Sequence, residues 1–274
     1  MWGCFPIYWA LLNHVSPSEV LVHRMLWSVP VLFLLVYSKP SWRINFKQSL
    51  SSKKELVFLF LTAILITINW GGYILAVNLG RVVEASMGYF LSPVINMIGG
   101  YLFFHERISK LKQLAVLFAT VGALYYVFSG DSFPWLGFLV GFTFSAYGIA
   151  RKAMSSSAVP GLYIETLILL PFFLVFSIWF YANFDIAFFN VDIPTDILLF
   201  LAGAVTVVPL ALFNAGAKLL PMTTVGILFL ITPTLQFLVG YYLQNESVNT
   251  NQLLGFVGVW TGLIMYSYGL IKEK

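Results

Sequence analysis

Apolar residues occur along this chain in long runs that are separated by short polar connections. A helix needs about 20 mostly apolar residues to cross a hydrocarbon core of ~30 Å, and nine of the runs approach or exceed that length. A tenth run, at the start of the chain, is shorter. The pattern predicts an all-α integral membrane protein with ten transmembrane helices, at residues 1–12, 20–38, 56–80, 84–104, 111–128, 134–150, 161–181, 196–217, 222–243 and 252–271.

Composition supports this fold class. Apolar residues make up 59% of the 274 positions and charged residues only 9%, whereas about a quarter of a soluble domain is charged. A soluble globule of this size could not bury so much apolar surface. The single cysteine, Cys4, excludes an internal disulfide, and neither a cysteine-based metal site nor a cofactor is expected.

The placement of Lys and Arg predicts an orientation. Under a ten-span model thirteen of these residues fall on one side, with five of them in the 39–55 connection, while Arg81 is in a loop of the other side and Arg24 lies within a span. The positive-inside rule therefore places both termini in the cytoplasm. Arg151, Lys152 and Lys218 are counted here as residues of cytoplasmic connections.

An internal repeat is visible in an ungapped register, because S92-P-V-I-N-M-I-G-G-Y-L-F-F-H-E106 is echoed by T232-P-T-L-Q-F-L-V-G-Y-Y-L-Q-N-E246. The predicted domains are two five-helix repeats, residues 1–130 and 131–274. Five spans are an odd number, so the second repeat enters the membrane inverted. Inverted repeats around a central site are typical of alternating-access transporters.

In the repeat register, the counterpart of the start of the sixth span would lie before Met1, so the first helix is shorter than its repeat partner. Residues 1–12 cover only ~18 Å at 1.5 Å per residue, which is too short for a span. We therefore expect that the native chain starts upstream of Met1. A signal peptide is not predicted, since no basic region precedes the run.

Ionisable side chains within spans are expensive and are therefore candidate functional groups. His23 and Arg24 lie about one turn inside the second span, and Glu165 lies about one turn inside the seventh. In the register that aligns Pro30 with Pro171, Arg24 and Glu165 are repeat counterparts, and each is a candidate gating group on its own side. Alternatively, Arg24 extends to the interface and Glu165 makes a local backbone or Lys152 contact.

Two spans carry a proline at matching positions, Pro93 and Pro233, and each proline leaves a backbone carbonyl without its helical donor. Paired helix breaks at matching depth point to a central binding site. Neighbouring polar and aromatic positions complete the candidate substrate pathway: Asn69, Trp70 and Tyr73 in the third span, Tyr89 and Asn96 in the fourth, and Gln236 in the ninth. Packing alone is the alternative explanation of the prolines.

Glu84 begins the fourth span and is interpreted as a helix cap. Gly258 and Gly262, like Gly137 and Gly141, form GxxxG steps that predict close helix packing. Enzymatic motifs such as HExxH, GxSxG and a phosphate-binding loop are absent from the sequence, so an enzyme is not predicted.

Four segments carry a resemblance to a known family: V20-L-V-H-R-M-L-W27, N69-W-G-G-Y-I-L-A-V-N78, E84-A-S-M-G-Y-F-L-S-P-V-I-N96 and I164-E-T166. Together with the five-plus-five pattern, they make the chain similar to the EamA family of the drug/metabolite transporter superfamily. The resemblance implies a multi-pass permease of the inner (cytoplasmic) membrane that works by secondary transport.

The prediction is thus a permease that exports a small organic metabolite or drug by alternating access, with the lipid bilayer as its surroundings and a proton as candidate coupling ion. An ungated pore and a non-transporting membrane scaffold are the alternatives. Nucleic acid is not an expected partner, because the net charge of +4 is small and dispersed.

Overall fold

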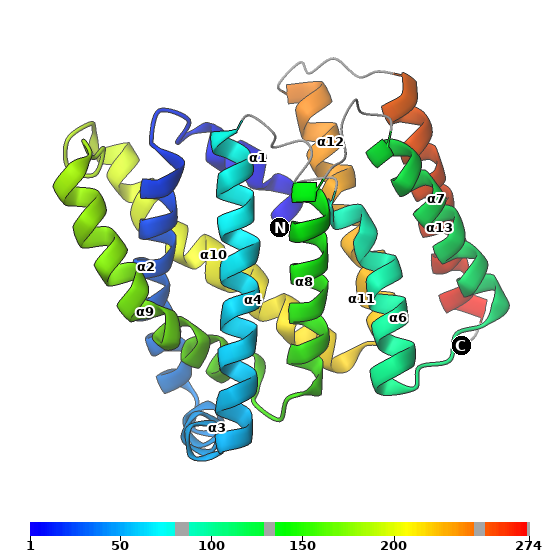
Figure 1. Cartoon of the computed structure of the whole chain (residues 1–274), viewed down its shortest axis with the longest axis horizontal. Helices are drawn as coiled ribbons and strands as arrows, with labels where there is room; N and C mark the ends of the chain where they lie inside the picture. Colours follow the sequence, from blue (N-terminus) through cyan, green and yellow to red (C-terminus); the bar gives the residue numbers. More distant parts are fainter. Residues whose placement is uncertain (80–87, 129–134, 244–249, 273–274) are drawn as a thin grey trace. The chain divides into compact units, whose positions relative to one another are not determined.

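The computed structural model describes residues 1–79, 88–128, 135–243 and 250–272, and all regular structure in these ranges is helical (Figure 1). The predicted residues Arg81, Glu84 and Glu246 lie outside them. In chain order the elements are η1 (Trp2–Cys4), α1 (Phe5–Ala10), α2 (Pro17–Ser38), α3 (Pro40–Ser51), α4 (Lys53–Asn78), η2 (Gly88–Leu91), α6 (Ser92–Phe104), α7 (Lys110–Phe128), α8 (Trp135–Ala153), α9 (Ala158–Asn183), α10 (Ile193–Leu219), α11 (Met222–Phe229), α12 (Ile231–Leu243) and α13 (Thr250–Lys272).

The described ranges contain six segments long and apolar enough to cross a membrane. They are Pro17–Ser38, Lys53–Ala76, Ala158–Asn183, Ile193–Leu219, Met222–Val239 and Leu253–Lys272. The predicted all-helical character is confirmed for the described part of the chain. Helices α7 and α8 coincide with two further predicted spans, and each has 19 residues, or about 29 Å of rise.

The predicted spans 84–104 and 222–243 are not continuous helices. In the first, the 3-10 turn η2 precedes α6, which has Pro93 in its first turn. In the second, α11 ends at Phe229 and α12 begins at Ile231, so the interruption precedes Pro233. A proline lacks the N–H that would bond to the preceding turn but fits the first turn of a new helix, which explains why both interruptions lie just before a proline.

The 39–55 stretch was expected to be a simple connection, and that expectation was wrong. It contains α3, which starts with Pro40 after the extended residue Lys39. Phe46 of α3 packs against the ring of Tyr163 on α9, with 5.3 Å between ring centroids. The short apolar contact on an otherwise polar helix explains why hydropathy did not reveal it.

The chain divides into two compact units, and each unit takes segments from both halves of the sequence. Unit 1 comprises Met1–Ile7, Ile66–Ile149 and Leu219–Lys274, and unit 2 comprises Tyr8–Leu65 and Ala150–Lys218.

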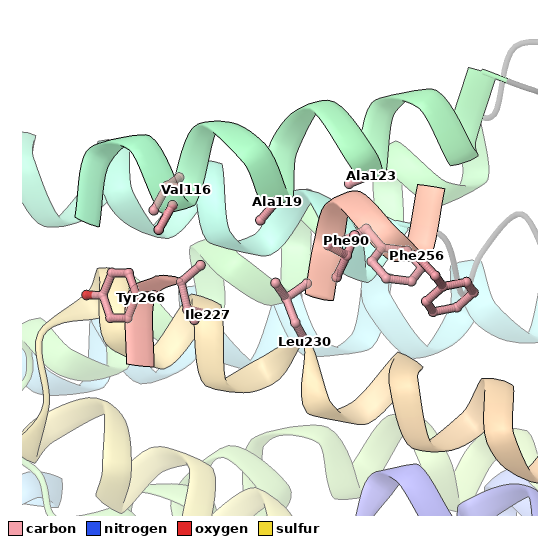
Figure 2. Packing of buried hydrophobic residues seen from close by; sticks show 10 residues of the cluster. Phe90, Val116, Ala119, Ala123, Ile227, Leu230, Phe256 and Tyr266 are labelled. Atoms are coloured by element: carbon pink, nitrogen blue, oxygen red, sulfur yellow. The ribbon is translucent and has the colours of Figure 1, made fainter. Parts of the chain in front are cut away.

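Unit 1 is built on the packing of α7 against α13 (Figure 2). Small residues of α7, including Ala119 and Ala123, face a buried apolar cluster that contains Leu230 and Phe256. A Cβ added to Gly258 would lie 2.8 Å from the Cα of Gly122. The glycine of the predicted GxxxG step therefore permits close approach of the two helices.

Unit 2 is built on α2, α9 and α10, which carry Arg24, Glu165 and Lys218. Each of the three helices contains an interior proline, at Pro30, Pro171 and Pro209. A Cβ added to Gly203 of α10 would lie 2.3 Å from the backbone carbon of Trp27 on α2. Glycine at this position allows α2 and α10 to approach closely enough for Arg24 to reach α10.

Candidate functional site

Glu165 is almost completely buried in α9, at 1% exposure. Its Oε1 accepts a hydrogen bond from the hydroxyl of Thr62 on α4, at 2.5 Å, and lies 3.5 Å from Nη1 of Arg151. A carboxylate in an apolar helix is expensive unless hydrogen bonds and an opposite charge compensate it. The partners predicted for Glu165 did not include either of these residues.

Arg151 was expected in a cytoplasmic connection, and the structure corrects this: it lies in the last turn of α8 with no exposed side-chain surface. Its Nη2 donates to the carbonyl oxygens of Ser157 and Ala158, at 3.2 and 3.0 Å. A Cβ on Gly161 would lie 2.2 Å from Nη1, so the first turn of α9 leaves room for the guanidinium only because residue 161 is glycine. The guanidinium is thus buried among protein acceptors.

Further polar side chains hold the α8–α9 connection around this ion pair. The carboxylate of Glu55 accepts the N–H groups of Ser155 and Ser156, both at 3.0 Å. Lys218, which was also expected in a connection, lies in the last turn of α10 and donates to the Met154 carbonyl. We call the set Asn45, Glu55, Thr62, Arg151, Glu165 and Lys218 the Arg151 cluster, in which Asn45 accepts the N–H of Ser157.

Arg24 and His23 lie on α2 and both contact other segments of unit 2. Nε of Arg24 donates to the hydroxyl of Thr206 at 3.0 Å, and its guanidinium lies 5.3 Å from the ring centroid of Trp9. His23 is buried, and its Nδ1 accepts from the indole N–H of Trp27 at 2.9 Å. The indole can only donate, so Nδ1 carries no proton in this arrangement. In the neutral ring the proton is on Nε2, which lies 3.1 Å from the Tyr181 hydroxyl.

Unit 1 contains an aromatic cluster that we define by Trp2, Tyr89, Phe144 and Phe229. Tyr89 lies 5.7 Å from Phe144 and 5.4 Å from Phe229, and Trp2 lies 5.6 and 5.5 Å from the same two rings, centroid to centroid. Gln236, a predicted pathway residue, donates from Nε2 to the Trp2 carbonyl at 3.3 Å. Tyr89 and Gln236 are thus connected through Trp2 and the two phenylalanine rings that Tyr89 and Trp2 share.

Asn96 and Pro93 lie on α6 against Gly226 of α11. A Cβ added to Gly226 would lie 2.8 Å from the Cα of Pro93 and 3.1 Å from Nδ2 of Asn96. Asn96 is 3% exposed, and neither its Oδ1 nor the hydroxyl of Ser92 one turn earlier has a hydrogen-bond partner among the described residues. Buried polar atoms normally have a hydrogen-bond partner, so a ligand or a water molecule is the partner that these two oxygens call for.

Asn69, a predicted pathway residue, has hydrogen-bond partners on a neighbouring helix. Its Nδ2 donates to the Val140 carbonyl at 2.7 Å and to the Thr143 hydroxyl at 3.3 Å, so the amide nitrogen connects α4 to α8. Tyr73 and Tyr89 pack against one small apolar cluster, whereas Trp70 is half-buried on α4. The amide nitrogen of Asn69 thus has partners within the protein, and the pathway role of this residue stays a prediction. Tyr73 and Tyr89 contact the same apolar cluster.

The residues that sequence reasoning missed are Glu55, Thr62 and Arg151 in unit 2, and Trp2 and Phe144 in unit 1. Arg151 was assigned to a loop because it ends a run of apolar residues beside Lys152. Phe144 carried no distinguishing signal among 26 phenylalanines, whereas Phe229 is the counterpart of Tyr89 in the repeat register. Within the described ranges no group of three or more potential metal-ligating residues occurs.

Comparison with known proteins decides the family. The model of the EamA-like transporter family matches residues 1–128. An uncharacterized transporter of Bacillus subtilis (strain 168), YojE, is 36% identical over 276 residues, which cover 100% of this chain and 92% of that protein. This chain belongs to the EamA-like transporter family.

Another member of the EamA-like family with a similar sequence is protein RarD of Escherichia coli (strain K12), 33% identical over 269 residues that cover 97% of this chain and 90% of RarD. The predicted family resemblance is thereby confirmed, and the chain is a relative of transporters. A crystal structure with 14% sequence identity shares the fold, with a TM-score of 0.72 over 97% of this chain and 93% of the other.

Proposed function

We propose that this EamA-like protein is a secondary permease of the cytoplasmic (inner) membrane, which exports a small organic metabolite or drug by alternating access. The observation that carries the proposal is the buried ion pair of Arg151 and Glu165, because α9 is also a candidate membrane span. Ionisable groups at such positions mark substrate or ion pathways in membrane proteins. A passive scaffold has no need for them.

The proposed repeats, residues 1–130 and 131–274, are supported by paired contacts within unit 2. In the register that aligns Pro30 with Pro171, α2 corresponds to α9 and α4 to α10. Arg24 on α2 hydrogen-bonds Thr206 on α10, and its counterpart Glu165 on α9 hydrogen-bonds Thr62 on α4. Both contacts therefore join corresponding pairs of helices, with opposite charges in the two repeats, although the two threonines are three residues apart in this register. Opposite charges at matching places suit gates that form on opposite sides of a pathway.

Glu165 is the proposed proton-coupling residue. In its ionised form it compensates the buried guanidinium of Arg151 and accepts the Thr62 hydroxyl. Protonation would remove that charge and leave only the backbone carbonyl partners of Arg151. The buried guanidinium would then lack a compensating charge, which destabilises this α8–α9 arrangement relative to one in which the pair is apart. A proton can thus bias a two-state gate at this point.

The proposed solute site lies in unit 1, around the aromatic cluster, Asn96 and Gln236. Ring faces suit flat organic solutes and organic cations, and a few amide groups can fix their orientation. The buried Oδ1 of Asn96 supports this assignment, because this oxygen accepts no hydrogen bond from any described residue.

Both termini are proposed to be cytoplasmic. This orientation rests on the excess of Lys and Arg in the connections of one side of a ten-span arrangement. The placement of Arg151 and Lys218 in helices removes two residues from that count but leaves the five in the 39–55 stretch, so the sign of the asymmetry is unchanged.

The test is substrate counterflow in proteoliposomes, with amino acids, aromatic metabolites and a neutral drug such as chloramphenicol, each with and without a proton gradient. We expect saturable counterflow of at least one compound and accumulation that needs the gradient. Glu165→Gln should keep counterflow but lose gradient-driven accumulation, whereas Asp185→Asn, the same kind of change at an exposed carboxylate, should alter neither.

The alternatives give different results. An ungated pore would show flux that does not saturate and no counterflow. Absence of flux for every compound with folded protein would favour a scaffold. If neither Arg24→Ala nor Glu165→Gln changed transport, the gating and coupling roles of these two residues would be withdrawn while the permease function stood.

A further inference from the structure

Unit 1 contains a partly open cavity of about 570 Å³ that is separate from the aromatic cluster. It is lined by the turn before α7, the start of α11 and the last turns of α13. Its volume is in the range of small-molecule sites. Neither the transport proposal nor the repeat pattern assigns it a role.

The lining combines cations with apolar residues. Arg107 is exposed, and Lys112 extends beside Tyr266 with its Nζ 5.7 Å from the ring centroid. The apolar part of the lining includes Leu228, 41% exposed, and Ile271, 75% exposed. A small soluble anion would use only the cations, whereas an amphiphile with an anionic head would use both kinds of surface.

Glu106 also lines the cavity, but its carboxylate is directed to protein donors. Oε1 accepts the N–H of Met222 at 2.8 Å and Oε2 that of Thr223 at 3.4 Å, at the first turn of α11. The backbone dipoles of this helix start partly offset its charge. The two basic residues therefore set the sign of the cavity.

The cavity lies at the ends of apolar helices. The candidate spans Met222–Val239 and Leu253–Lys272 begin and end at its wall, and α7 starts there with Lys110 and Lys112. The first turn of α7 holds no acidic residue, although a helix start favours negative charge. Ends of membrane spans lie at the level of the lipid head groups, so an anion at this level is supplied by the bilayer itself.

We propose that this cavity binds an anionic phospholipid, with its phosphate between Arg107 and Lys112 and its acyl chains over Leu228, Leu270 and Ile271. The site is independent of the solute pathway, so the proposal does not depend on transport. Basic pockets between membrane helices are known to hold anionic head groups in this way.

The experiment is native mass spectrometry of the purified full chain in a neutral detergent, titrated with phosphatidylglycerol, phosphatidylcholine or glycerol 3-phosphate. We expect tighter binding of phosphatidylglycerol than of phosphatidylcholine, and no displacement by equimolar glycerol 3-phosphate. Arg107→Gln/Lys112→Gln should weaken phosphatidylglycerol binding about 25-fold, a factor of about five for each cation.

The matched control is Arg43→Gln/Lys47→Gln, which removes one exposed arginine and one exposed lysine from α3. It should leave the affinity unchanged. Equal losses in both double variants, or equal binding of the two lipids, would overturn the site. Displacement of phosphatidylglycerol by glycerol 3-phosphate would show that the site recognises a soluble phosphate and not a lipid. Should the double variant unfold, Arg107→Gln alone, at an exposed position, decides with its expected fivefold loss.

Discussion

Arg151 and Glu165 form an ion pair in unit 2, in which the guanidinium Nη1 lies 3.5 Å from the carboxylate Oε1 and the two side chains are 0% and 1% exposed. The pair connects the end of α8 to the first turns of α9 and is surrounded by the other members of the Arg151 cluster. Two charges without water stabilise the fold only while both are present, because either one alone would be buried without compensation. Their coupling is therefore measurable.

The first prediction is a double-mutant cycle on this pair. Arg151→Met and Glu165→Gln should each lower the free energy of unfolding by about 3–5 kcal/mol, since each leaves an uncompensated buried charge. The double variant should be more stable than the sum of the two losses predicts, by about 1–3 kcal/mol. Chemical unfolding of the detergent-solubilised protein measures all four forms.

Exposed counterparts provide the control for that cycle. Arg43→Met and Asp185→Asn change an arginine and a carboxylate at exposed positions and should stay within about 0.5 kcal/mol of the parent. Strictly additive losses for Arg151→Met and Glu165→Gln would mean that the two charges are compensated independently.

The second prediction compares two glycines of α10. Gly203→Ala should destabilise the protein by about 1–3 kcal/mol, because its Cβ would lie 2.3 Å from the backbone of Trp27. Gly216→Ala has no heavy atom within 4 Å of the added Cβ and should stabilise by about 0.4–1 kcal/mol, since alanine lowers the entropy of the unfolded chain. Thermal unfolding midpoints of the two variants should therefore move in opposite directions. A shift in the same direction would show that helix propensity, and not the α2–α10 contact, dominates.

The sequence allowed the helices to be placed because apolar run length is a direct consequence of bilayer thickness. The predicted span 161–181, for example, lies within α9, and 111–128 falls within α7. Hydropathy averages over a window, so it gave 84–104 and 222–243 as single spans, and only the prolines Pro93 and Pro233 pointed to breaks within them. It also missed α3, whose apolar contacts are too few to raise a window average.

The site was harder to predict because its chemistry depends on which side chains meet. Glu165 was identified from its charge within a span, but its partners Thr62 and Arg151 lie on two other helices, α4 and α8. Asn69 has the residue type of a ligand contact, and only the structure shows that its amide nitrogen bonds to Val140 and Thr143. Residue type indicates what a group can do, whereas its neighbours decide what it does.

The third prediction distinguishes these two roles for Asn69. If its amide serves packing, Asn69→Ala should lower the free energy of unfolding by about 1–3 kcal/mol, because the carbonyl of Val140 loses a buried donor. The affinity for a transported solute, measured by counterflow, should change less than about twofold. A large loss of affinity with unchanged stability would place Asn69 in the solute site instead.

The fourth prediction concerns acid and the start of α10, where Asp192 precedes the helix and its Oδ1 accepts the Thr195 N–H at 2.8 Å. Hydrogen bonds from Thr195, with a contribution from the charge of His14, lower the pKa of the Asp192 carboxyl below its ordinary value of 3.8. Because the folded state has the lower pKa, the stabilisation is present above the unfolded value and is lost as the pH falls through the folded value.

Asp192→Asn keeps an oxygen acceptor at this helix start but cannot titrate, so it isolates the contribution of the charge. The parent should have the higher unfolding midpoint at pH 7, and the difference should shrink as the pH is lowered from about 5 to about 3. Thermal unfolding of both forms across that range measures it. If the difference between parent and variant stays constant with pH, the carboxylate charge at Asp192 does not contribute to the stability of α10.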